Sequence, residues 1–111
     1  MKSFDLGKLA AAQGGEYVLA AKDLDSRACY LVYGLLKSGE QDRLIKPGDG
    51  YEEILCAVTG SLLMKLTGGA VVLEQGHAVH VRPADSFYVS NPNNNPVVYV
   101  IAGGRSETVQ G

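Results

Sequence analysis

Several residue patterns that identify common protein classes are missing from this sequence. The 111-residue chain contains no run of Lys or Arg and has a formal net charge of -2, so it lacks the basic surface with which nucleic-acid-binding proteins contact phosphates. No apolar stretch approaches the ~18 residues that are needed to cross a bilayer. We therefore expect neither a nucleic-acid partner nor a membrane partner.

The chain also has few features of a secreted protein. Charges at Asp5 and Lys8 interrupt any apolar run before the small residues 10–12, whereas a signal peptide needs such a run. The two cysteines, Cys29 and Cys56, match no metal-binding or redox spacing, and two thiols do not make a disulfide framework. We expect them to be small buried side chains in a reducing compartment, which predicts a cytoplasmic protein.

Signatures of common catalytic sites are absent from the sequence as well. It contains no Gly-rich phosphate loop, no Gly-x-Ser-x-Gly nucleophile elbow and no His-Glu-x-x-His zinc motif. No side chain is identified as a nucleophile with an evident base. We therefore assign no catalytic residue and expect no cofactor.

What the sequence does contain is a strong strand pattern. Apolar residues make up 46% of the chain, which is enough for one core at this length. A short helix is expected over residues 5–12, capped by Asp5 and ended by the sequence Gln13-Gly14-Gly15. Beyond it, short runs rich in Val, Leu and Tyr alternate with Gly, Pro, Asn and Asp turns. Nine strands are expected, over residues 16–20, 28–37, 43–46, 52–59, 61–66, 70–73, 78–81, 86–90 and 97–101.

Nine short strands with tight turns indicate an all-β sandwich or closed barrel. No internal repeat, linker or break in composition divides the chain, so we expect one domain. The predicted organisation is an N-terminal extension with a short helix over residues 1–15, a barrel over 16–102 and a flexible polar tail over 103–111.

The segment that begins at Glu53 resembles the two sequence motifs of the cupin superfamily. Glu53 is followed by six residues and Gly60, then by an apolar hairpin, and finally by Gly76 and Asn91 at the expected separation. The first family motif runs His-x-His, three or four residues, Glu, six residues, Gly. The second runs Gly, five residues, Pro-x-Gly, two residues, His, three residues, Asn. The resemblance covers residues 35–102 and implies a cupin double-stranded β-helix, which is a jelly-roll barrel.

The chain departs from these motifs at the histidines that hold a metal in the family. Those positions are occupied by Pro47 with Asp49, or by Lys46 with Gly48, and by Phe87. Imidazole is the usual ligand of iron, nickel, zinc and copper in such sites, so the resemblance implies a cupin without a bound metal. The chain shares this gap with the cupin domain of the ethanolamine-utilisation Q family, to which it is distantly similar.

The polar residues that remain define the expected ligand pocket. If the resemblance holds, Tyr51 and Glu53 point into the barrel, where a carboxylate is costly unless it is paired or protonated. Two interpretations stay open. In the first, Glu53 is hydrogen-bonded to Tyr51 or to a cation, namely Lys46, Arg43 or Arg82. In the second, it holds a polar group of a ligand or acts as an acid or base. The expected pocket consists of Tyr51, Glu53, Phe87, Arg43, Lys46 and His80.

Phe87 and the two histidines carry further expectations. Phe87 is expected to fill the cavity and make it drier. His77 and His80 lie three residues apart on a strand, so they face opposite sides and cannot bind one metal ion together. His80 facing the cavity would join Glu53 as a two-ligand metal site, which is fewer ligands than metal sites normally have. We therefore assign no metal-binding set.

Three functions fit these observations. The first is a metal-independent cupin that binds a small polar or anionic metabolite and acts as a sensor or accessory protein. The second is a metal-independent isomerase, epimerase or lyase in which Glu53 acts with Tyr51 or His80 as acid and base. The third is a structural, dimeric docking module.

A homodimer is expected for each of these functions. Pairing of two copies buries an exposed edge strand, which is otherwise an aggregation hazard. In the docking module, the interface is expected to contain outward-facing tyrosines, either Tyr30 or Tyr33 together with Tyr88.

Overall fold

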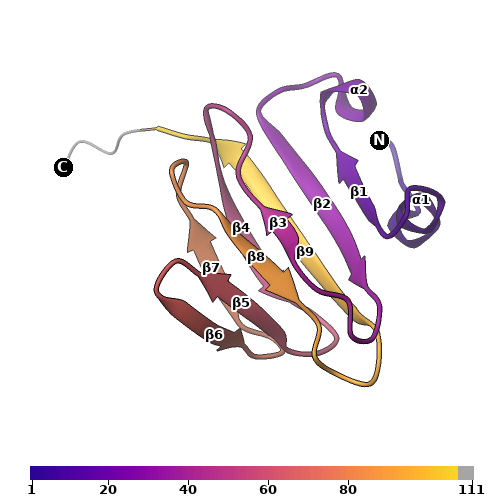
Figure 1. Ribbon diagram of the computed structural model, residues 1–111. Helices are drawn as coiled ribbons and strands as arrows, with labels where there is room; N and C mark the ends of the chain where they lie inside the picture. Colours follow the sequence, from indigo (N-terminus) through magenta and orange to yellow (C-terminus); the bar gives the residue numbers. More distant parts are fainter. Residues whose placement is uncertain (108–111) are drawn as a thin grey trace.

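Two antiparallel sheets dominate the computed structural model, which describes residues 1–107 (Figure 1). The larger sheet has the strand order β1-β2-β9-β4-β7, and the smaller one has the order β3-β8-β5-β6. All nine predicted strands are present, and the all-β jelly-roll architecture is confirmed. Their bounds are β1 Glu16–Leu19, β2 Cys29–Leu36, β3 Arg43–Ile45, β4 Tyr51–Ala57, β5 Leu62–Leu66, β6 Gly69–Leu73, β7 Ala78–Val81, β8 Phe87–Ser90 and β9 Val97–Arg105.

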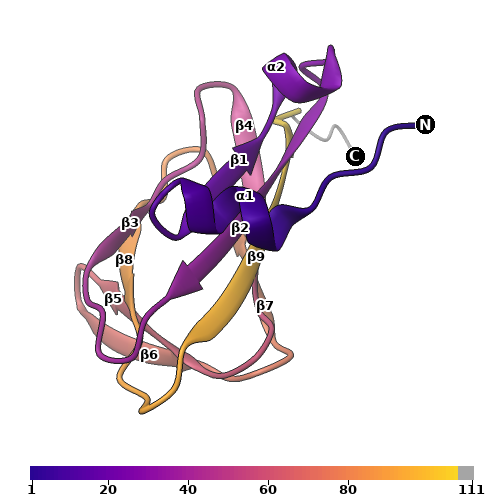
Figure 2. The same cartoon turned by 90° about the vertical axis from the view of Figure 1, so that its right-hand side faces the viewer.

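The two sheets face each other and enclose the main core between them (Figure 2). Successive side chains of a strand point to opposite faces, and β4 shows this alternation clearly. Glu53, Leu55 and Ala57 are buried, whereas Ile54 is 52% exposed. Glu53 therefore points into the barrel, as expected, and Leu55 and Ala57 point the same way.

The expected N-terminal helix is present as α1, Leu6–Ala12. It begins at Asp5, whose carboxylate accepts a hydrogen bond from the backbone N–H of Lys8 at 3.1 Å. The helix packs on the outer face of β1 and β2, where Ala10, Tyr17 and partly buried Tyr33 form a second apolar cluster. Tyr33 therefore lies on the outer face of the sheet but is partly covered by this cluster.

A second helix, α2 at Ala21–Leu24, was not expected from the sequence. Asp23 stabilises it by accepting hydrogen bonds from the backbone N–H of Ala20 at 3.3 Å and from the Tyr17 hydroxyl at 2.9 Å. A four-residue helix that depends on a tertiary contact leaves no periodic signal in the sequence. Within residues 1–107, neither helix has the length and apolar content to cross a membrane.

Strand β9 lies between β2 and β4 and runs further than predicted. The expected strand ended at Ile101, but Gly103 and Gly104 continue the pairing with both neighbours, and Arg105 pairs with Tyr51 of β4. The prediction that the polar tail begins at Gly103 is therefore wrong. Gly103 and Gly104 lack the apolar side chains that mark a strand in the sequence, yet they lie inside the sheet. Residues 108–111 of the expected tail lie outside the described residues.

Asn91, the last residue of the second motif, has a clear structural role. Its side chain is fully buried, and its amide group donates to the carbonyls of Leu36, Lys37 and Asn95 at 3.1, 3.1 and 2.8 Å. Its amide oxygen accepts a hydrogen bond from the backbone N–H of Asn93 at 2.9 Å. Asn91 thus joins the end of β2 to the loop that precedes β9.

Candidate functional site

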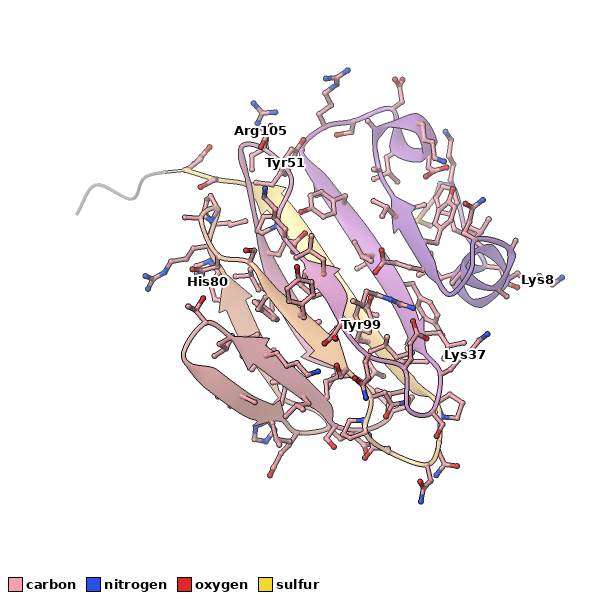
Figure 3. The ribbon with its side chains drawn as sticks, viewed as in Figure 1. Lys8, Lys37, Tyr51, His80, Tyr99 and Arg105 are labelled. Carbon is pink, nitrogen blue, oxygen red and sulfur yellow. The ribbon has the colours of Figure 1, made fainter. Side chains whose placement is uncertain are left out.

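A cavity of about 400 Å³ opens at the end of the barrel near α2. Its walls come from β1, β2, β3, β4 and β9, and they include the apolar side chains of Val18, Val32, Ile45 and Ile101. Tyr51 lies at this end of the barrel beside Arg105 (Figure 3). The volume falls in the range that is typical of small-molecule sites.

Glu53 lines this cavity and is the most deeply buried ionisable residue in its wall, with 4% of its surface exposed. Its Oε2 accepts a hydrogen bond from the Tyr30 hydroxyl. Its Oε1 has no hydrogen-bond partner among the described residues. Burial raises the pKa of the Glu53 carboxyl above its usual range, and the negative charge of Glu16 raises it further, while the Tyr30 hydrogen bond acts in the opposite direction.

The register of three strands explains how Tyr30 reaches Glu53. Gly103 of β9 lies opposite Tyr30 on one side and opposite Glu53 on the other. Because Gly103 has no side chain, the Tyr30 ring lies directly over it, and an added Cβ would be 2.3 Å from the ring. The hydroxyl can therefore cross β9 and donate to the carboxylate.

The same arrangement occurs a second time in the larger sheet. Gly34 of β2 lies between Glu16 of β1 and Tyr99 of β9. The Tyr99 ring covers Gly34, where an added Cβ would be 2.0 Å from the ring. The Tyr99 hydroxyl donates to Glu16 Oε2. Each tyrosine thus spans a glycine and fixes a carboxylate that lines the cavity.

Tyr30 is a site residue that the sequence did not reveal. Its ring packs edge-on against Tyr51, with the centroids 5.2 Å apart, and burial together with the Glu53 hydrogen bond raises the pKa of its hydroxyl. The phenol therefore remains a proton donor at neutral pH. Alternation along β2, where Val32, Gly34 and Leu36 are buried, was the available signal for an inward Tyr30. This signal was obscured because the alternate positions of the strand are also apolar.

Glu53 does not have the partners that the sequence suggested. The Tyr51 hydroxyl donates to the backbone carbonyl of Arg27 and not to Glu53. The Arg43 guanidinium donates to Glu40 Oε2 at 2.8 Å and to the Tyr99 hydroxyl at 3.2 Å. In the strand order β2-β9-β4, a glycine of β9 separates Tyr30 from Glu53, so the partner comes from β2, two strands away from β4.

The six predicted pocket residues divide into two groups. Tyr51, Glu53 and Lys46 line the cavity, whereas Arg43, Phe87 and His80 do not. Phe87 is buried in the main core opposite Ile45, where it fills space between the sheets.

His80 lies on the outer face of β7, which corrects the expectation that it faces the cavity. Its Nε2 is 2.9 Å from Glu52 Oε1, and the side chain is about half exposed. Strand alternation buries the next residue, Val81, and so directs His80 outward. His80 and Glu53 therefore do not form a two-ligand metal site.

The residues of the site do not fit a metal centre. Among residues 1–107, no group of three or more His, Cys, Asp or Glu side chains is placed to hold a metal ion. Glu53 retains the position of one family ligand, but the positions of the histidines carry Lys, Pro, Gly, Asp and Phe. One carboxylate without imidazole neighbours is an inadequate donor set for the metals of this fold.

The thiols are more accessible than expected. Cys29 is exposed and lines the cavity, while Cys56 is partly exposed on β4. Cys29 is the first residue of β2.

Two facing antiparallel sheets, jelly-roll connections and a glutamate at the family position define the fold class: the chain has the cupin fold. Comparison with solved structures agrees, at low sequence identity. A cupin protein from Bacteroides fragilis is 18% identical with a TM-score of 0.71, over 100% of this chain and 92% of that one. A Cupin 2 conserved barrel domain protein from Salinispora arenicola is 16% identical with a TM-score of 0.71, over 96% and 88%. A sugar phosphate isomerase of the cupin superfamily from Silicibacter pomeroyi is 19% identical with a TM-score of 0.64, over 94% and 68%.

The sequence comparisons add no closer assignment. No protein-family model matches the chain, and no curated protein matches it.

Proposed function

We propose that this chain is a metal-independent binding protein whose cavity holds a small molecule, and that it acts as a sensor or accessory protein. The observation that carries the proposal is the cavity of about 400 Å³ whose wall contains a buried carboxyl group with one unpartnered oxygen. Glu53 is the residue that binds the polar group of the ligand.

The unpartnered oxygen of Glu53 gives ligand binding an energetic basis. A buried polar atom without a hydrogen bond costs about 1–3 kcal/mol, and Glu53 Oε1 is such an atom. The terminal torsion of a carboxyl group is soft, so a small rotation brings this oxygen toward a group in the cavity. A ligand that supplies a hydrogen bond removes the cost, while the apolar walls bind its remaining surface.

Cys29 allows a direct test, because it lines the cavity and the sequence contains a single other cysteine. In a Cys56→Ser variant, N-ethylmaleimide attached to Cys29 would obstruct the cavity. Ligand-observed NMR with a library of small fragments would then compare the blocked and unblocked protein. The matched control is a Cys29→Ser variant labelled at Cys56, outside the cavity.

We expect a subset of fragments to bind the unblocked protein and the control, and to lose binding when Cys29 is blocked. If no fragment binds, or if the bound fragments are indifferent to the Cys29 label, the cavity is not a small-molecule site.

A second candidate function, proton transfer by Glu53, is favoured by the raised pKa of its carboxyl and by the Tyr30 hydrogen bond. A carboxyl group with a pKa closer to neutral is a better general acid or base than an ordinary one. In this alternative the protein is an isomerase, epimerase or lyase. Tyr30 then acts with Glu53 in the role for which the sequence suggested Tyr51 or His80.

Exchange in D₂O tests this alternative. Bound fragments that carry a C–H next to a carbonyl would lose the signal of that proton faster with the native protein than with Glu53→Gln. Exchange at the rate of the buffer alone would exclude Glu53 as a base for such ligands.

A further inference from the structure

The charged groups of the cavity are distributed unevenly. Glu53 and Glu16 both line it; Glu53 is buried and Glu16 is partly buried. The cations in its wall, Arg27 and Lys46, are exposed at the mouth, where water solvates them. The inner part of the cavity is therefore acidic.

Arg43, a partly buried cation, makes no direct bond to Glu53 or Glu16. Its guanidinium is bound to Glu40, to the Tyr99 hydroxyl and to the backbone carbonyl of Leu35 at 3.1 Å. It does not line the cavity. In the part of the chain that the structure describes, no cation is bonded to Glu53.

This arrangement determines which ligand charge is favourable. A buried carboxylate needs both a hydrogen-bond donor and a compensating positive charge, and the Glu16 charge increases that need. An ammonium group supplies both, and charge-assisted hydrogen bonds are about twice as strong as neutral ones. A ligand carboxylate would add a third negative charge beside Glu53 and Glu16.

Tyr30, beside Glu53, adds to the preference for a positively charged ligand. Tyr30 lines the same cavity, and its hydroxyl is fixed by Glu53 and by the Gly48 N–H, which donates to it at 3.4 Å. Aromatic rings attract ammonium groups, and this attraction increases in a desolvated site.

We infer that the ligand of this cavity is an amine: a small apolar body with a positively charged amino group, which Glu53 binds directly and Glu16 attracts. This inference rests on the proposed binding function and concerns the charge of the ligand. The sequence led us to expect a polar or anionic metabolite, whereas the cavity favours a ligand with a positive charge.

Three probes of one size and different charge test the inference: cyclohexylamine, cyclohexanol and cyclohexanecarboxylate. Isothermal titration calorimetry at neutral pH would measure their affinities for the native protein, for Glu53→Gln and for Glu52→Gln. Glu52 is the matched control, because it is the adjacent residue but bonds to His80 and Ser106 outside the cavity. Circular dichroism would check that each variant is folded, and Glu16→Gln would serve as a second cavity variant.

We expect the amine to bind the native protein at least about tenfold more tightly than the alcohol, since a hydrogen bond between two charged groups is stronger than one to a neutral hydroxyl. Glu53→Gln should lose this preference, Glu16→Gln should reduce it, and Glu52→Gln should keep it. Binding of the alcohol or the carboxylate as tightly as the amine would overturn the inference and leave the binding function in place. If none of the three binds, the amine inference fails as well, while the Cys29-blocking experiment decides the binding function separately.

Discussion

Glu53 combines two properties at the scale of a single residue: its carboxyl group is buried, and one of its oxygens has no partner. Burial raises its pKa above the ordinary value of 4.5. The folded protein therefore binds a proton more tightly at this position than the unfolded chain does. The stability that this proton contributes is fully present below pH 4.5 and is lost as the pH rises through the raised pKa.

Replacement of Glu53 by Gln should remove this pH dependence, because an amide does not ionise. In urea unfolding at a series of pH values from 4.5 upward, the native protein should lose stability by at most ~1.4 kcal/mol per pH unit from this group. Glu53→Gln should be flatter over the same range and more stable than the native protein at neutral pH. Glu52→Gln is the control and should retain the loss. Equal slopes for native protein and Glu53→Gln would show that the pKa of Glu53 is not raised.

Asn91 provides a second prediction at this scale. In Asn91→Asp the side chain no longer donates to the three carbonyls that Asn91 satisfies, and a charge replaces a neutral amide in a fully buried position. We expect a loss of at least about 3 kcal/mol in the free energy of unfolding. Asn94→Asp, at an exposed position in the same loop, should change it by less than about 0.5 kcal/mol. Similar effects of the two substitutions would contradict the structural role of Asn91.

At the scale of the elements, the site depends on strands β2 and β9, because each strand has a tyrosine that lies over a glycine of the other. Tyr30 of β2 crosses Gly103 of β9 to reach Glu53, and Tyr99 of β9 crosses Gly34 of β2 to reach Glu16. The positions of both cavity carboxylates therefore depend on the absence of a side chain in the neighbouring strand.

Two adjacent glycines of β9 allow a matched test. Gly103→Ala places a methyl group against the Tyr30 ring, whereas Gly104→Ala meets no heavy atom within 4 Å. Overpacking of this kind costs about 1–3 kcal/mol, so Gly103→Ala should lower the thermal midpoint and weaken fragment binding by displacing Tyr30. Gly104→Ala should leave both nearly unchanged. If Gly103→Ala changed neither the thermal midpoint nor fragment binding, the proposed role of the glycine would be contradicted.

The element scale also shows what the sequence can predict. The strands were predictable because Gly, Pro, Asn and Asp turns separate them, and the inward face of β4 was predictable from alternation and the motif that contains Glu53. The partner of Glu53 was not predictable, because Tyr30 is 23 residues distant in sequence and becomes a neighbour only through the strand order β2-β9-β4. The outward direction of His80 was equally hidden, since β7 is four residues long and alternation alone allows either register.

At the scale of the whole molecule, the homodimer remains a prediction. Strand β6 forms an edge of the smaller sheet and exposes Val71 and Val72 at 50% and 57%. Such an edge is a natural place for two copies to pair. Light scattering should give twice the chain mass at high concentration, and Val72→Lys should lower the mass toward that of the monomer. A native monomer at high concentration would contradict the prediction.

The most direct test of the account is the position of a bound amine in the protein. A crystal structure of the native protein soaked with cyclohexylamine should show the ring against Val32 and Ile101, with its nitrogen within about 2.7–3.2 Å of a Glu53 oxygen. An amine bound only elsewhere on the protein, or one in the cavity with its nitrogen directed away from Glu53, would contradict the account.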